Sequence, residues 1–179
     1  MSLLNAWPAF TTEILRSNTT TPMSTPMSKP EEALLGSLPS LGAMIGVALA
    51  GFLMNNFGRR NAGLILSLPI LLSWAIVNIT TSLYLVLASR FLAGISGGGS
   101  LMITPIFVSE VAEDAIRGTL ASASIFFYCT GLMIAYIIGW LLTYRTVIWI
   151  NLATCATSTI LLILVTESPM FFLKRNREE

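Results

Sequence analysis

Long runs without charged residues alternate with short polar breaks along most of the chain. The runs cover 33–58, 61–89, 118–144 and 146–166, and a polar break at 78–82 divides the second of them. Its later part continues past a single arginine to about residue 109. A helix needs about 20 mainly apolar residues to cross a bilayer. The pattern therefore predicts an all-α membrane protein, a helical bundle of five spans within residues 33–166.

Three flanking segments differ from these runs. Residues 1–14 are apolar but too short to cross a bilayer, and we interpret them as the remnant of a first transmembrane helix. Residues 15–32 are rich in Ser, Thr and Pro and are predicted to form an extracellular loop, in which Asn18 begins an Asn-X-Thr glycosylation sequence. Residues 167–179 are polar and basic, which is typical of the start of a cytoplasmic linker.

The basic residues predict the orientation of the bundle. One side collects Arg59, Arg60, Arg117, Lys174, Arg175 and Arg177, and the other holds only Arg16, Lys29 and Arg145. Cytoplasmic loops carry an excess of Lys and Arg. We therefore expect Arg59, Arg60, Arg117 and the C-terminus in the cytoplasm and residues 15–32 outside, in the plasma membrane.

Composition narrows the possible functions further. Hydrophobic residues make up 54% of the chain and charged residues 11%, the net charge is +1, and histidine is absent. This balance argues against a nucleic-acid partner, and no cofactor or metal is indicated. Cys129 and Cys155 sit singly in apolar runs and read as small packing residues. No nucleophile–base set is visible, so we expect no catalytic residues and no enzyme.

Small residues recur at helical spacing in three of the predicted spans. The candidate packing positions are Gly42, Gly46, Gly94, Gly98, Gly131 and Gly139. Such stripes allow two membrane helices to approach closely. The cluster at 97–100 is not a phosphate loop, because no Gly-Lys-Ser/Thr follows it.

Arg90 lies inside a predicted span. A charge at this depth is costly unless it is paired, faces a polar pathway or reaches the interface. We favour a polar pathway or a buried partner over simple snorkelling to the surface, which remains the alternative.

Three motifs resemble the sugar-porter branch of the major facilitator superfamily. They are Gly51-X-X-X-Asn55-X-X-Gly58-Arg59-Arg60, the stretch Arg90-Phe-Leu-X-Gly94 through Pro105 to Gly118, and Glu167-Ser168-Pro169. The amino-acid sequence of residues 108–120 is similar to that of insect facilitated trehalose transporters. The resemblance implies a facilitative carrier of trehalose or a hexose that works by alternating access, with a sugar and the lipid bilayer as its partners.

The resemblance also implies roles for individual residues. Cytoplasmic gate charges would be Arg59, Arg60, Glu110, Arg117 and Glu167, and the substrate pathway would include Arg90, Ile125, Tyr128 and Leu132. Ile125 stands where most sugar porters have a sugar-binding Gln. Tyr128 could offer a hydroxyl and a stacking surface, or be a packed aromatic residue.

The family has twelve helices in two halves, and this chain corresponds to the first half without most of its first helix. We expect a missing C-terminal half as a partner, and a truncated gene model, a fragment and a real short form all remain open. The small-residue stripes of the second and fifth family helices would then lack partners. The alternative function is a non-transporting half-bundle that binds another protein.

Overall fold

The computed structural model describes residues 6–7, 28–80, 82–113 and 116–164. Its long helices are α2 (Lys29–Phe57), α3 (Arg59–Ile79), α4 (Leu83–Val111), α5 (Arg117–Leu141) and α6 (Tyr144–Leu164). All 5 are long and apolar enough to cross a membrane. The predicted all-α membrane bundle is therefore confirmed. The predicted glycosylation residue Asn18 and the predicted gate residue Glu167 lie outside the described ranges.

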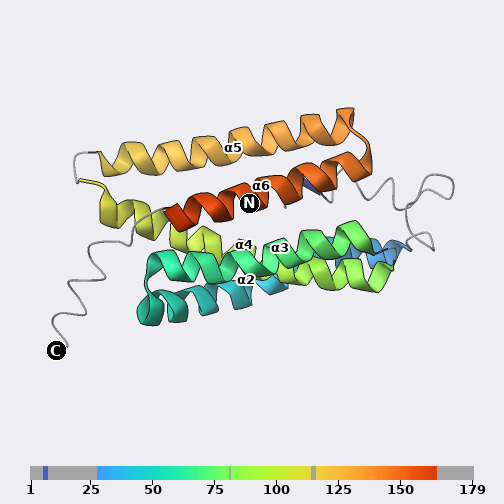
Figure 1. The fold of residues 1–179 in the computed structure, drawn as a ribbon, viewed down its shortest axis with the longest axis horizontal. Coiled ribbons are helices and arrows are strands. Elements are labelled where there is room, and N and C mark those ends of the chain that lie inside the picture. The colour runs from blue at the N-terminus through green and yellow to red at the C-terminus, as the bar shows by residue number, and fades with distance from the viewer. Residues whose placement is uncertain (1–5, 8–27, 81, 114–115, 165–179) are drawn as a thin grey trace.

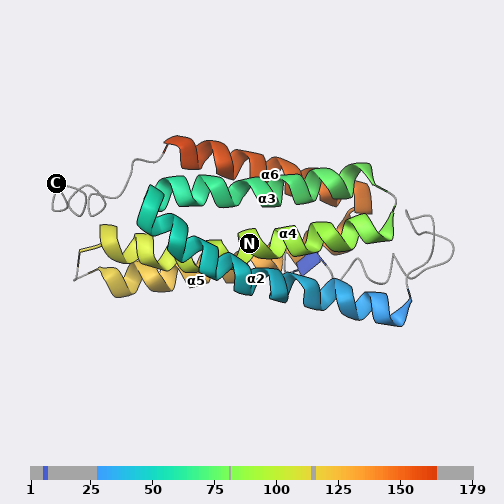
Figure 2. The ribbon, with the colours of Figure 1, turned by 90° about the horizontal axis from the view of Figure 1, so that it is seen from below.

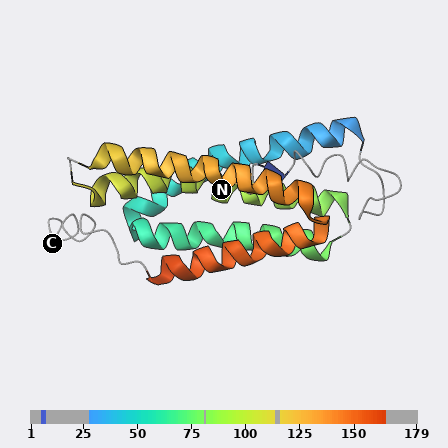
Figure 3. The ribbon, with the colours of Figure 1, turned by 90° about the horizontal axis from the view of Figure 1, so that it is seen from above.

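The helices run side by side in two layers (Figures 1 and 2). One layer holds α3 and α6, and the other holds α2, α4 and α5, with α2 crossing α4 obliquely (Figure 3). The start of α3, the end of α4 and the start of α5 meet at one end of the bundle, at the left in Figure 1. We call this the charged end, because it carries Arg59, Glu110 and Arg117.

α2 begins four residues before the predicted span, at Lys29. Ser28 is its N-cap and forms a capping box with Glu31, whose carboxylate accepts the backbone N–H of Ser28 at 2.8 Å. Pro30 sits in the first turn, where a missing N–H costs nothing. The last four residues of the predicted 15–32 loop are therefore helical, because local capping extends the helix beyond its apolar part.

The small-residue stripe on α2 packs directly against α4. A Cβ atom added to Gly42 or Gly46 would collide with the backbone of Phe91 or Ile95 on α4. The contact is reciprocal, since a Cβ atom on Gly94 or Gly98 would collide with the α2 backbone at Pro39 or Ala43. The expectation that this stripe lacks a partner is therefore wrong: glycines on both helices remove the side chains that would hold the two backbones apart.

α5 is the least enclosed of the five helices. Only 6% of the most apolar stretch of α5 is buried, against 39% of the corresponding stretch of α4. Within its own stripe Ala135 is buried and Gly131 and Gly139 are half-buried. Large side chains such as Phe127 and Trp140 are exposed on other faces. α5 is thus held to the bundle by few contacts, and most of its surface is available to lipid or to another segment.

Candidate functional site

An ion pair joins α3 to α4 at the charged end. Arg59 donates from Nε and Nη2 to Oε1 of Glu110, at 3.0 and 2.6 Å. The two side chains are 17% and 15% exposed, so water only partly screens the pair. Arg59 is the first residue of α3 and Glu110 lies in the last turn of α4. The pair therefore fixes the two helix ends relative to each other.

The other predicted gate charges have different surroundings. Nη2 of Arg60 donates to the backbone carbonyl of Ile163, near the end of α6. Helix carbonyls in this position have no intrahelical partner, so an arginine can satisfy them. Arg117 is exposed at the start of α5. The structure thus brings Arg59 and Glu110 together and connects Arg60 to a third helix.

Arg90 is fully buried near the opposite end of the bundle. Its guanidinium carbon lies 4.1 Å from the ring centroid of Trp7 and 4.7 Å from that of Trp74. The Trp7 ring also lies near Tyr144, with a centroid distance of 6.2 Å. Cations are attracted to aromatic faces, most strongly where water is excluded. Arg90 is therefore held among aromatic rings rather than snorkelling, and the two rings that it faces belong to residue 7 and to α3.

Several buried polar side-chain atoms have no hydrogen-bond partner among the described residues. They include Nε, Nη1 and Nη2 of Arg90, Oγ of Ser73, Oδ1 of Asn151 and Nε1 of Trp7. Ser73 and Asn151 lie on α3 and α6, the helices that supply Trp74 and Tyr144. A buried polar group without a hydrogen-bond partner costs about 1–3 kcal/mol, so these atoms lower the stability of the core.

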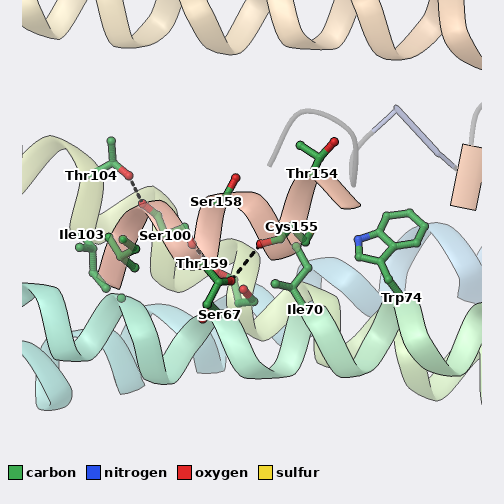
Figure 4. A pocket seen from close by; sticks show the side chains of 13 residues that line it. Ser67, Ile70, Trp74, Ser100, Ile103, Thr104, Thr154, Cys155, Ser158 and Thr159 are labelled. Carbon is green, nitrogen blue, oxygen red and sulfur yellow. Dashed lines mark hydrogen bonds between the residues drawn. The ribbon is translucent and has the colours of Figure 1, made fainter. Parts of the chain in front are cut away.

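A groove runs between α3, α4 and α6 (Figure 4), and we call it the hydroxyl groove. Its volume is about 290 Å³. It is lined by Gly63, Ser67, Ile70, Trp74, Ser96, Ser100, Ile103, Thr104, Thr154, Cys155, Ser158, Thr159 and Leu162. Most of its hydroxyls already donate to carbonyls of their own helices, for example Ser100 to Ser96 and Thr159 to Cys155. What such hydroxyls still offer to an occupant is acceptor lone pairs.

A second groove of about 550 Å³ lies between α4 and α5, and we call it the α4–α5 groove. It is lined by Ser100, Leu101, Thr104, Pro105, Val108, Ser109, Arg117, Ala121, Ser124, Ile125, Phe127 and Tyr128. Two predicted pathway residues, Ile125 and Tyr128, therefore share one groove. Leu132 is half-buried one turn further along α5, and Arg90 is enclosed in the aromatic cluster.

Sequence reasoning missed the hydroxyl groove. A usable signal was present, because Ser96, Ser100 and Thr104 recur every four residues on α4 and so share one face. Ser67 and Thr159 face the same groove from α3 and α6, which the spacing within one helix could not reveal. Among the described residues there is no group of three or more His, Cys, Asp or Glu that could hold a metal ion.

The sequence matches a family model described as "Sugar (and other) transporter" over residues 3–179. It is 30% identical to the mouse solute carrier family 2 facilitated glucose transporter member 8, over 79% of this chain and 30% of that protein. It is 27% identical to the facilitated trehalose transporter Tret1 of Drosophila virilis, over 96% of this chain and 19% of that protein. The chain thus spans less than a third of the length of these relatives.

The fold is similar to that of solved transporters. The inward-open xylose transporter XylE from E. coli superimposes with a TM-score of 0.78 at 20% identity, covering 98% of this chain and 48% of that one. Its partially occluded inward-open form gives a TM-score of 0.77 at 23% identity. At these identities the likeness speaks for the fold alone.

Proposed function

This chain belongs to the sugar transporter family, and from that premise we propose that it forms the N-terminal half of a sugar carrier working by alternating access. Such carriers place their substrate between two bundles that rock against each other. One bundle of membrane-length helices is present here, and it corresponds to about half of a solved transporter chain. The proposed substrate is trehalose or a hexose, in keeping with the names of the relatives.

The observation that carries this proposal is the Arg59–Glu110 pair at the charged end. An inner gate must close firmly and reopen on every cycle. A partly exposed ion pair suits this task, since water can replace each partner as the gate opens and surface pairs contribute only about 1 kcal/mol or less. We propose that Arg60, Arg117 and Glu167 belong to the same cytoplasmic gate.

We propose that the α4–α5 groove forms this half's wall of the sugar pathway. Tyr128 and Ser124 on α5 face the groove, as do Ser100 and Thr104 on α4. Hydroxyl side chains can exchange hydrogen bonds with sugar hydroxyls, and an aromatic ring can stack on a sugar face. Ile125 contributes only apolar contact. Leu132 would border the pathway one turn further along α5. Arg90, the remaining predicted pathway residue, is fully buried and is not among the residues that line this groove.

We propose that the first transmembrane helix, of which residues 1–14 would be the remnant, lies along the hydroxyl groove. Ala6 and Trp7 are fully buried, and the Trp7 ring lies 6.3 Å from that of Trp74, which lines the groove. Small hydroxyl residues permit close packing of membrane helices, which supports this placement.

Reconstitution tests the proposal. The chain alone, in vesicles, should give no saturable uptake of trehalose or glucose, whereas the chain joined to the C-terminal half of a related carrier should restore it. The control is the same fusion carrying Glu110→Arg, which places like charges together at the gate. Saturable uptake by the chain alone would contradict the half-carrier proposal, and a fusion that folds but carries no sugar would contradict the transport proposal.

A further inference from the structure

We propose that the α4–α5 groove of this chain holds one acyl chain of a phospholipid from the surrounding bilayer, with the lipid phosphate beside Arg117. This occupant goes beyond the proposed function, which assigns only a sugar to the same wall. An acyl chain and a sugar would exclude each other there, because both would contact Ile125 and Tyr128.

The middle of the groove is apolar. Its walls there are Leu101, Pro105 and Val108 from α4, and Ala121, Ile125 and Phe127 from α5. Ser100, Thr104, Ser109 and Ser124 also line the groove, but their hydroxyls donate to carbonyls of their own helices. A hydrocarbon chain gains dispersion contacts with both walls and is supplied by the bilayer itself. The lining of the hydroxyl groove is more polar, with seven Ser and Thr residues against four in the α4–α5 groove.

The length of the groove matches one leaflet. Arg117 begins α5 at the charged end, and Tyr128 lies eleven residues further along the same helix. At 1.5 Å per residue this stretch measures about 16 Å. Half of a typical hydrocarbon core is about 15 Å thick. An acyl chain whose headgroup lies at Arg117 would therefore end near the level of Tyr128.

The end of the groove suits a phosphate. Arg117 is exposed and lines the groove where α5 starts. A Cβ atom added to the neighbouring Gly118 would meet nothing within 4 Å, so the first turn of α5 is open beside Arg117. Arginine binds phosphate through charge-assisted hydrogen bonds, and basic pockets between membrane helices take lipid headgroups.

Photolabelling tests the proposal directly. The purified chain is placed in nanodiscs of phosphatidylcholine with a trace of the same lipid carrying a diazirine on one acyl chain. After irradiation, labelled positions are mapped by mass spectrometry. We expect labelling concentrated in 101–108 and 121–128, on the order of tenfold above the lipid-exposed face of α6, which corresponds to a preference of about 1.4 kcal/mol.

Two variants with matched controls separate groove binding from general contact with lipid. Ala121→Trp fills the groove and should abolish the excess labelling, whereas Ala153→Trp, on an exposed position of α6, should not. Arg117→Gln should lower it, whereas Arg145→Gln, exposed at the opposite end of the bundle, should not. Thermal unfolding of each variant confirms that it is folded.

Uniform labelling of all lipid-exposed faces would overturn the proposal. So would excess labelling that persists in folded Ala121→Trp, or cross-links between two copies of the chain through the groove, which would make a second copy the occupant. No sugar is present in the photolabelling measurement, so absence of groove labelling would not contradict the transport proposal. Equally, absence of sugar uptake would not contradict the lipid proposal.

Discussion

Arg59 at the start of α3 and Glu110 near the end of α4 are 51 positions apart in sequence, and the arginine places two hydrogen bonds on one carboxylate oxygen of the glutamate. Partly exposed ion pairs contribute about 1 kcal/mol or less. We predict that Glu110→Gln lowers the stability of the chain by about this amount and that Glu110→Arg, which places like charges together, lowers it further. Thermal unfolding in detergent micelles measures the change.

The double variant Arg59→Glu/Glu110→Arg should recover part of the lost stability, because it restores opposite charges at the same positions. Arg145→Gln serves as the control, since that side chain is exposed at the other end of the bundle. Equal stability of the wild type and Glu110→Arg would show that the Arg59–Glu110 pair does not stabilise the contact between α3 and α4.

The glycine contact between α2 and α4 should not tolerate side chains. Gly46→Val would place carbon atoms against the backbone of Ile95 and should force the helices apart. Overpacking of this kind typically costs about 1–3 kcal/mol. Gly36→Ala on the same helix meets nothing within 4 Å and should be neutral or mildly stabilising. The yield of monodisperse protein and its unfolding temperature distinguish the two variants.

Arg90 and Trp74 should respond in opposite ways to removal. Trp74→Leu leaves the guanidinium buried with one aromatic face lost, so it should destabilise the chain. Arg90→Met removes a buried charge whose nitrogens have no hydrogen-bond partner among the described residues, and such replacements are often neutral or stabilising by about 1–4 kcal/mol. Unfolding temperatures of both variants are compared with the wild type. A larger loss for Arg90→Met than for Trp74→Leu would mean that the guanidinium has a strong polar partner.

The orientation predicted from the basic residues can be measured with single cysteines. In a Cys129→Ser/Cys155→Ser background, Lys29→Cys should react with an impermeant thiol reagent from outside the cell. Gly118→Cys, at the charged end, should react only after the membrane is opened. Both positions are exposed, so access to the reagent does not depend on unfolding. Reaction of both from the same side would contradict the topology.

The sequence by itself determined the five membrane helices and pointed to the family. Both depend on local information. Uncharged runs of sufficient length predict the spans, and short contiguous motifs such as Gly58-Arg59-Arg60 indicate the family. The sequence pattern did not locate every helix boundary, because the Ser28–Glu31 capping box extends α2 into residues that hydropathy assigns to a loop. The role of Asn18 and Glu167 stays a prediction.

Only the tertiary structure decided which faces meet. The spacing of Gly42 and Gly46 predicts close packing but cannot name α4 as the partner, because that choice depends on how the helices cross in space. Likewise Arg90 was expected to have a polar route or a buried partner, and its neighbours Trp7 and Trp74 come from distant parts of the chain. Sequence periodicity identifies which residues share one face of a helix. Which neighbouring helix that face contacts depends on how the side chains of both helices pack together.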